Sequence, residues 1–151
     1  TAFFLLQSFY ISEHLEYDLT FRELITDLNY PERTTILQQF TAFTYNLHVN
    51  GIYFIDHSPG NTLIVKTKEG KYQFYLVDLN RIRFGKLDYK TRIQNFARLS
   101  LTDEMVEIIA NQYALIADKD FEEVYATMLN VCHASAEKRA RKAALKKKIG
   151  R

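Results

Sequence analysis

The amino-acid sequence predicts an α+β domain that is mainly helical and carries a small sheet. Three short apolar stretches, near 53–55, 62–66 and 72–78, have the length and the flanking turn residues of strands. The last two are expected to pair as a hairpin across the turn KEGK. The segments on either side of them follow a helical pattern. With 151 residues, of which 47% are hydrophobic, the chain can bury one core.

Two helices are predicted before the sheet. The stretch TFRELITDL places Thr20 and Glu23 in the spacing of a capping box, which satisfies free N–H groups at a helix start. A longer helix is predicted from Pro31 to Gly51, because proline suits a first helical turn and glycine a helix end. One apolar stripe runs along it, formed by Ile36, Leu37, Phe40, Phe43 and Leu47.

Three helices are predicted after the sheet, over about 88–100, about 102–117, and from 120 into the C-terminal segment. Thr102 is a suitable N-cap, and the two acidic residues after it suit the positive end of a helix dipole. The stretch AFFLLQSFYISEHL, near the N-terminus, is predicted to form one strand or a tight pair of strands.

Polar residues that could take part in catalysis or metal binding lie at two of the predicted strand ends. The segment DHSPGN contains Asp56 and Asn61 around a Pro-Gly turn, and Asp78 ends the third strand. Carboxylate and amide oxygens suit a magnesium ion that stays partly hydrated and bridges phosphates. With Asn61 and Asp78 on such a metal, Asp56 is free to accept a proton from an attacking hydroxyl. The alternative is that the two aspartates only cap turns.

The order LHVNGIYFIDHSPGNTLIV followed by FYLVDLNRIRF resembles the lipopolysaccharide kinase family, the Kdo and heptose kinases of Gram-negative inner-core assembly. DHSPGN and VDLNR are its most specific pieces, and the similarity covers about residues 8–117. The resemblance implies the C-terminal lobe of a protein-kinase-like fold, with a small β-hairpin sheet that carries the catalytic and metal-binding loops. It also implies ATP and magnesium as cofactors, Asp56 as the catalytic base, and Asn61 and Asp78 as metal ligands.

The resemblance also implies a division of the chain. Residues 1–15 would be a remnant of N-lobe strands and the hinge, 16–136 the C-lobe, and 137–151 a basic tail. The backbone of Glu13 and Leu15 would bind adenine. A kinase needs a glycine-rich loop and a strand lysine before this lobe, so the chain is expected to be an incomplete kinase with little turnover alone.

Several departures from the kinase pattern bear on the acceptor. Phe54-Ile55-Asp56 stands in place of H-R-D, Asp78-Leu79-Asn80 stands in place of D-F-G, and an A-P-E motif is absent. Ser58 lies where many protein kinases have a phosphate-contacting lysine. These differences favour a glycolipid or other small acceptor over a regulated protein kinase. A kinase of another acceptor, such as a protein or small alcohol, and a pseudokinase-like binding module stay open as alternatives.

The acceptor that the resemblance implies is a lipid A-linked core sugar, with Kdo ahead of heptose. Arg81 and Arg83 are candidates for contact with its acidic groups, because arginine binds carboxylate and phosphate in a bidentate way. His57 and Ser58 are further substrate candidates. The plainer alternatives are surface ion pairs for the arginines and packing within the turn for His57.

The C-terminal segment 137–151 holds eight Lys or Arg and a single Glu, whereas the rest of the chain carries more acidic than basic residues. The plainest interpretation of this segment is a solvated helix end, whose cations suit the C-terminal end of a helix dipole. With a lipid-linked substrate, the segment is expected to attract an anionic membrane surface rather than nucleic acid. The protein is therefore placed at the cytoplasmic face of the inner membrane, as a peripheral protein.

The apolar stretch 3–11 is expected to offer an exposed strand edge for self-association.

Overall fold

The computed structural model describes residues 14–148 and 150, and it confirms the α+β class. The predicted apolar strand at 3–11, the self-association assigned to it, and Glu13 lie outside these residues. The helices of the described part are α1 (Phe21–Thr26), α2 (Arg33–Val49), α3 (Tyr89–Phe96), α4 (Asp103–Ala117) and α5 (Phe121–Lys148). The strands are β1 (Leu19–Thr20), β2 (Ile52–Phe54), β3 (Thr62–Lys66), β4 (Tyr72–Leu76) and β5 (Ile82–Phe84). Two short 3₁₀ turns, η1 (Pro59–Asn61) and η2 (Leu79–Arg81), complete the order.

The strands form two small antiparallel units. One is a three-stranded sheet in the order β1-β3-β4, and the other is the ribbon β2-β5. The predicted hairpin across KEGK is confirmed, with Thr67 N–H donating to the Lys71 carbonyl at 2.7 Å and Gly70 at a positive φ of 75°. Strand β4 ends at Leu76, two residues earlier than the sequence pattern predicts. The chain turns away there because Asp78 adopts a left-handed conformation, with φ 58°.

The predicted helix caps are also present. The Thr20–Glu23 capping box opens α1, and the Thr102 hydroxyl accepts from the Met105 N–H at the start of α4. Helix α2 begins at Arg33 instead of Pro31, because Glu32 takes a left-handed conformation with φ 57°. Gly51 follows its end with φ 71°, and a Cβ there would lie 2.7 Å from the carbonyl oxygen of Gly85. Only glycine fits at position 51, where these two segments of the chain cross.

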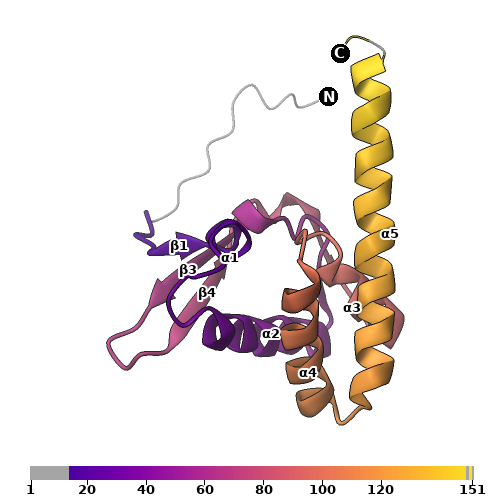
Figure 1. Cartoon of the computed structure of the whole chain (residues 1–151). Coiled ribbons are helices and arrows are strands. Elements are labelled where there is room, and N and C mark those ends of the chain that lie inside the picture. The colour runs from indigo at the N-terminus through magenta and orange to yellow at the C-terminus, as the bar shows by residue number, and fades with distance from the viewer. Residues whose placement is uncertain (1–13, 149, 151) are drawn as a thin grey trace, which may run out of the picture.

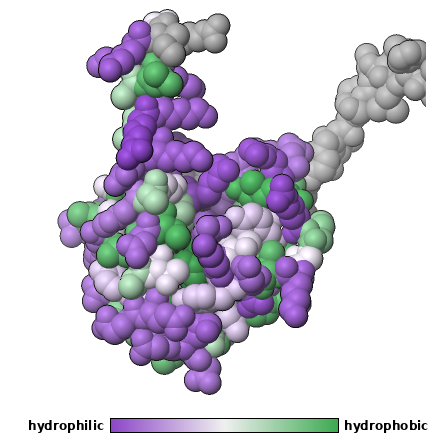
Figure 2. Space-filling model, turned by 90° about the vertical axis from the view of Figure 1, so that its right-hand side faces the viewer, coloured by the Kyte–Doolittle hydropathy of each residue, from purple (hydrophilic) through white to green (hydrophobic). Residues whose placement is uncertain are grey.

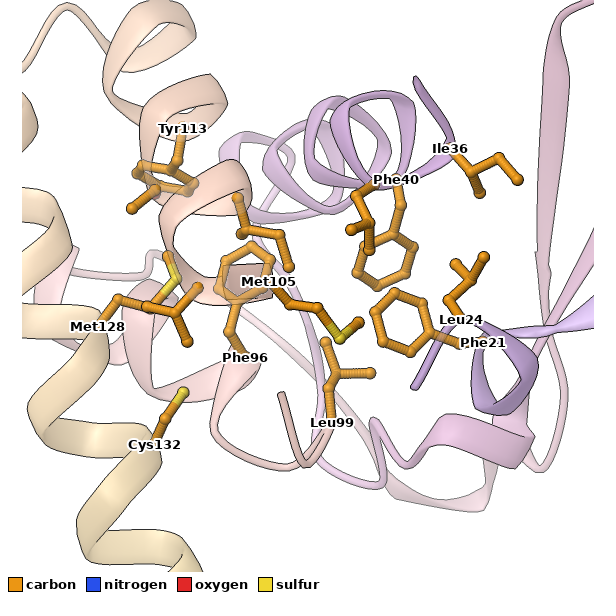
Figure 3. Packing of buried hydrophobic residues seen from close by; sticks show 14 of the residues in the cluster. Phe21, Leu24, Ile36, Phe40, Phe96, Leu99, Met105, Tyr113, Met128 and Cys132 are labelled. Carbon is orange, nitrogen blue, oxygen red and sulfur yellow. The ribbon is translucent and has the colours of Figure 1, made fainter. Parts of the chain in front are cut away.

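One apolar core extends from the sheet to the C-terminal helix. Helices α2 and α4 pack against each other at its centre, with α1 on one side and α5 on the other (Figure 1). Phe21 and Phe40 meet with their ring centroids 4.5 Å apart, and Met105 and Phe96 continue the packing toward Met128 (Figure 3). The elements that carry the polar strand ends are thus held by a common core.

Helix α5 runs without a break across residues 136 and 137, where the basic tail was predicted to begin. Its first half buries Val124, Met128 and Cys132, and burial raises the pKa of the Cys132 thiol to about 11. Its second half stands clear of the body and is covered mainly by hydrophilic side chains (Figures 1 and 2). The basic residues up to Lys148 therefore belong to the same helix as the packed residues of its first half. Within 14–148 and 150, no helix has both the length and the apolarity needed to cross a membrane.

The capping box predicts the effect of a single substitution. Thr20→Ala removes the hydroxyl that accepts from the Arg22 N–H at 3.2 Å and donates to Glu23 at 2.6 Å. We expect the free energy of unfolding to fall by about 1 kcal/mol, measured by chemical denaturation. Thr34→Ala is the matched control, at an exposed position inside the first turn of α2, and it should change stability by less than about 0.5 kcal/mol. Equal losses from the two substitutions would contradict a capping role.

Candidate active site

Two hydrogen bonds join the loop after β2 to the turn after β4, and a third closes that loop on itself. The Ile55 N–H donates to the Arg81 carbonyl at 2.9 Å, so η2 is joined to the residue before Asp56. The Asn61 side-chain amide donates to the Asp56 carbonyl at 2.9 Å and closes the loop 56–61 on itself. The Val77 N–H donates to the Asn61 carbonyl at 3.0 Å. Asp56, Asn61 and Asp78 are thus placed on neighbouring, directly bonded segments.

The amide of Asn61 has a fixed orientation. Its NH₂ group must face the Asp56 carbonyl, because two oxygens placed there would repel each other. The Oδ1 atom therefore points away from that carbonyl, and within the described part of the chain it accepts no hydrogen bond. A half-buried amide oxygen of this kind is available as a ligand for a hard cation.

Asp78 occupies the turn between β4 and η2. Its left-handed backbone, φ 58° and ψ 56°, is a conformation that Asp tolerates better than most residues. The carboxylate is exposed, and one of its oxygens, Oδ1, accepts from the Asn80 side-chain amide at 2.8 Å. That bond restricts the carboxylate and leaves Oδ2 free for a further ligand.

Asp56 lies between two arginines. Arg81 Nη1 is 3.8 Å from one carboxylate oxygen and Arg98 Nη1 is 3.9 Å from the other, while the Asp56 side chain is 28% exposed. Both separations exceed hydrogen-bond length, so neither guanidinium occupies the carboxylate lone pairs. The carboxylate is thus open to a proton donor, with a guanidinium on either side of it.

A buried polar network holds the loop after β2 against the core. The Asn95 side-chain amide donates to the Phe54 carbonyl at 2.8 Å, and its Oδ1 lies 2.9 Å from His48 Nε2. Since the Asn95 oxygen can only accept, His48 carries its proton on Nε2. Burial lowers the pKa of His48 to about 4, so the imidazole is neutral near pH 7. This network joins α2, α3 and the end of β2, two residues before Asp56.

His57 does not reach the surface, and its assignment as a substrate contact is corrected. The ring is fully buried, with centroids 5.4 Å from Phe40 and 5.8 Å from Phe54. Burial lowers its pKa to about 3. A side chain with no exposed surface cannot touch an acceptor, so His57 acts by packing the loop onto the core.

The other predicted residues are distributed around the site. Ser58 is partly exposed at the start of η1, and Arg81 is brought to Asp56. Arg83 is opposite Tyr53 in the β2-β5 ribbon and lines a different hollow. Leu15 is partly buried in an irregular segment. The structure therefore brings Arg81, and not Arg83, to the candidate base.

The sequence pattern did not assign a role to Asn95 or to the pairing of β2 with β5. The helix segment RIQNFARLS holds no signal that singles out Asn95, because five of its nine residues are polar. Its partners come from positions 48 and 54, which no local spacing connects.

Neither the protein-family models nor the curated proteins contain a match to this chain. Within the part of the chain that the structure describes, no three His, Cys, Asp or Glu side chains are grouped in the manner of a metal site. Asn61 and Asp78 supply two oxygen ligands at most, so a cation there would need further oxygens from water or from a bound phosphate.

The buried imidazole predicts a pH dependence of stability. An unfolded His48 titrates near 6.5 and the folded one near 4, so the unfolded chain binds the extra proton between these values. Its contribution is complete above about pH 6.5 and is lost as the pH falls toward 4. We expect His48 to account for a fall of about 2 kcal/mol in the free energy of unfolding from pH 7 to pH 5.

Denaturant titrations of the wild type and of His48→Gln measure this term. Glutamine can still donate to Asn95 but does not titrate, so the variant should lose less stability over the same pH range. The stability of the variant should still fall somewhat as the pH is lowered, because burial lowers the pKa of His57 as well. Parallel stability curves for the two proteins would contradict the assignment to His48.

Proposed function

We propose that this chain is the C-terminal lobe of an ATP- and magnesium-dependent phosphotransferase with a protein-kinase-like fold. The observation that carries the proposal is the hydrogen-bonded junction of two segments, the loop that holds Asp56 and Asn61 and the turn that holds Asp78. A carboxylate followed five residues later by an amide, and then by a metal-binding carboxylate further along the chain, is the arrangement that protein kinases use for phosphoryl transfer.

Each residue has a chemical task in this proposal. The Asp56 carboxylate accepts the proton of the acceptor hydroxyl as that oxygen bonds to the γ-phosphorus of ATP and the bond to ADP breaks. The Asn61 Oδ1 atom and the Asp78 carboxylate would hold magnesium, which would supply positive charge to neutralise the phosphates. Arg81 and Arg98, each within 4 Å of Asp56, add positive charge beside the transferred group.

The acceptor and the location follow from the resemblance to lipopolysaccharide kinases. We propose a lipid A-linked core sugar as acceptor, Kdo before heptose, at the cytoplasmic face of the inner membrane. The adenine would bind to the backbone around Glu13 and Leu15, beneath a glycine-rich lobe. The cationic second half of α5 supports a membrane-side location, because it projects from the body and ends in Lys146, Lys147 and Lys148 (Figure 1).

Two carboxylate variants test the chemistry in the polypeptide that carries this chain together with a nucleotide-binding lobe. With MgATP and Kdo-lipid A, Asp56→Asn should lower kcat by a factor of about 10²–10⁴. Asp78→Asn should lower activity and raise the magnesium concentration needed for half-maximal rate. Glu69→Gln, at an exposed position in the hairpin turn, is the control and should retain full activity.

Thermal melting of the same proteins separates chemistry from folding. An Asp56→Asn variant that transfers phosphate at the wild-type rate would overturn the assignment of the base. An inactive variant that also unfolds would show that Asp56 stabilises the turn. The junction of the two segments would then no longer support a kinase.

Binding to lipid vesicles tests the membrane-side location. Changing Lys146, Lys147 and Lys148 to glutamine should weaken binding to anionic vesicles by about 100-fold, since each cation near such a surface contributes about 1 kcal/mol. The charge-matched control changes Lys68, Lys86 and Lys90, which are exposed on other elements, and should have a smaller effect. Equal losses in both triple variants, or binding that is insensitive to salt, would contradict a role for the end of α5.

A further inference from the structure

A hollow of about 610 Å³ lies beside the candidate base. It is bounded by α5, by the loop after β2 and by the turn between α3 and α4. We call it the basic groove. It is lined by Ser58, Pro59, Arg98, Ser100, Ser135, Lys138, Arg139 and Lys142. Its volume falls within the range of small-molecule sites, about 300–1,000 Å³. Four of its lining residues are cationic and three carry hydroxyl groups, whereas none of them is Asp or Glu.

One face of α5 forms the wall of the basic groove. Ser135, Lys138, Arg139 and Lys142 follow the spacing i, i+3, i+4 and i+7, which places side chains on the same side of a helix. Acidic residues near this wall are engaged elsewhere. Glu137 pairs with Arg141 at 3.2 Å, and Asp103 lies 2.8 Å from His133.

The wall is held in place by Arg139. Its Nη1 atom donates to the Ala97 carbonyl at 3.0 Å and to the Ser135 hydroxyl at 2.7 Å. This joins α5 to the end of α3, one residue before Arg98. Ser100, on the opposite wall, is kept at a positive φ of 59° in the turn between α3 and α4. Like charges are therefore held around one hollow, an arrangement that a bound anion would stabilise.

The basic groove is continuous with the candidate active site. Ser58 lies two residues after Asp56, and Arg98 lines the groove while its Nη1 atom is 3.9 Å from the Asp56 carboxylate. An anionic group bound among Arg98, Lys138 and Lys142 would leave a neighbouring hydroxyl of the same molecule close to Asp56.

We infer that the basic groove is the site that binds a phosphate or carboxylate group of the acceptor. This inference rests on the proposed function, because that function makes the bound molecule an acceptor of phosphate. The binding itself requires neither nucleotide nor magnesium. Lysine and arginine form strong charge-assisted hydrogen bonds with both kinds of anion, and the serine hydroxyls add neutral donors. The groove, rather than Arg83, then selects the acidic group.

NMR titration of the ¹⁵N-labelled chain tests the inference without nucleotide. The probes are Kdo, glucose 6-phosphate, glucose and inorganic phosphate. Kdo and glucose 6-phosphate should shift the amide signals of Ser58, Ser100 and the 135–142 segment of α5, whereas glucose should not. Inorganic phosphate should bind more weakly than either acidic sugar, because it lacks the saccharide contacts.

A pair of charge-matched variants locates the site on α5. Lys138→Gln with Lys142→Gln should weaken binding of the acidic sugars by about tenfold or more. Lys147→Gln with Lys148→Gln removes the same charge from the same helix outside the basic groove, and should change the affinity by less than about twofold. These substitutions lie at exposed positions, and the helical circular dichroism signal checks that both variants stay folded.

Three results would overturn the inference: equal weakening by both double variants, binding of glucose as tight as that of Kdo, or inorganic phosphate as tight as either acidic sugar. The last would mean that the groove takes free anions only. Asp78→Asn separates this inference from the proposed function, because it should impair phosphoryl transfer and leave binding of Kdo unchanged. Binding of Kdo in the groove by a polypeptide that carries both lobes and yet shows no kinase activity would therefore reject the function alone.

Discussion

The side-chain amide of Asn95 is the interaction on which the rest of the site depends. It donates to the last carbonyl of β2 and accepts from His48, so a single buried group joins α2, α3 and the strand that leads to Asp56. A buried amide that loses either partner leaves a polar group unpaired, at a cost of about 1–3 kcal/mol. The loop after β2 is consequently held in one position by the core, and its polar residues need not be ordered by a ligand.

The loop above this network is rigid for a second reason. Asn61 closes it through the Asp56 carbonyl, and backbone bonds connect it to the turn that carries Asp78. Arg81 and Arg98 then lie on either side of Asp56, at distances that leave its carboxylate oxygens uncovered. Preorganised charge of this kind is the main means by which a protein assists transfer of a highly charged group. The same Arg98 extends the positive surface into the basic groove, so the candidate base and the proposed anion site share one residue.

Local features were predictable because their physical causes are local. The Thr20 capping box, the Thr102 cap and the hairpin turn at Gly70 each depend on residues within a few positions of one another. The start of α2 was misplaced by two residues because the left-handed conformation of Glu32 has no signal in its residue type. For His57 the sequence left substrate contact and packing within the turn open, and the structure favours packing, because Phe40 and Phe54, from two other elements, enclose its ring.

By itself, the sequence determined the α+β class, most of the helices, and the residues whose oxygen atoms could do chemistry: Asp56, Asn61 and Asp78. The tertiary structure alone decided which cations accompany them. Arg98 and Lys138 are forty residues apart in the chain, and they line one groove because α5 buries Val124, Met128 and Cys132 against the core and is joined to Ala97 by Arg139. The reason is that caps and turns are set by neighbours in the chain, whereas the position of a helix on its core is set by side-chain packing between distant segments.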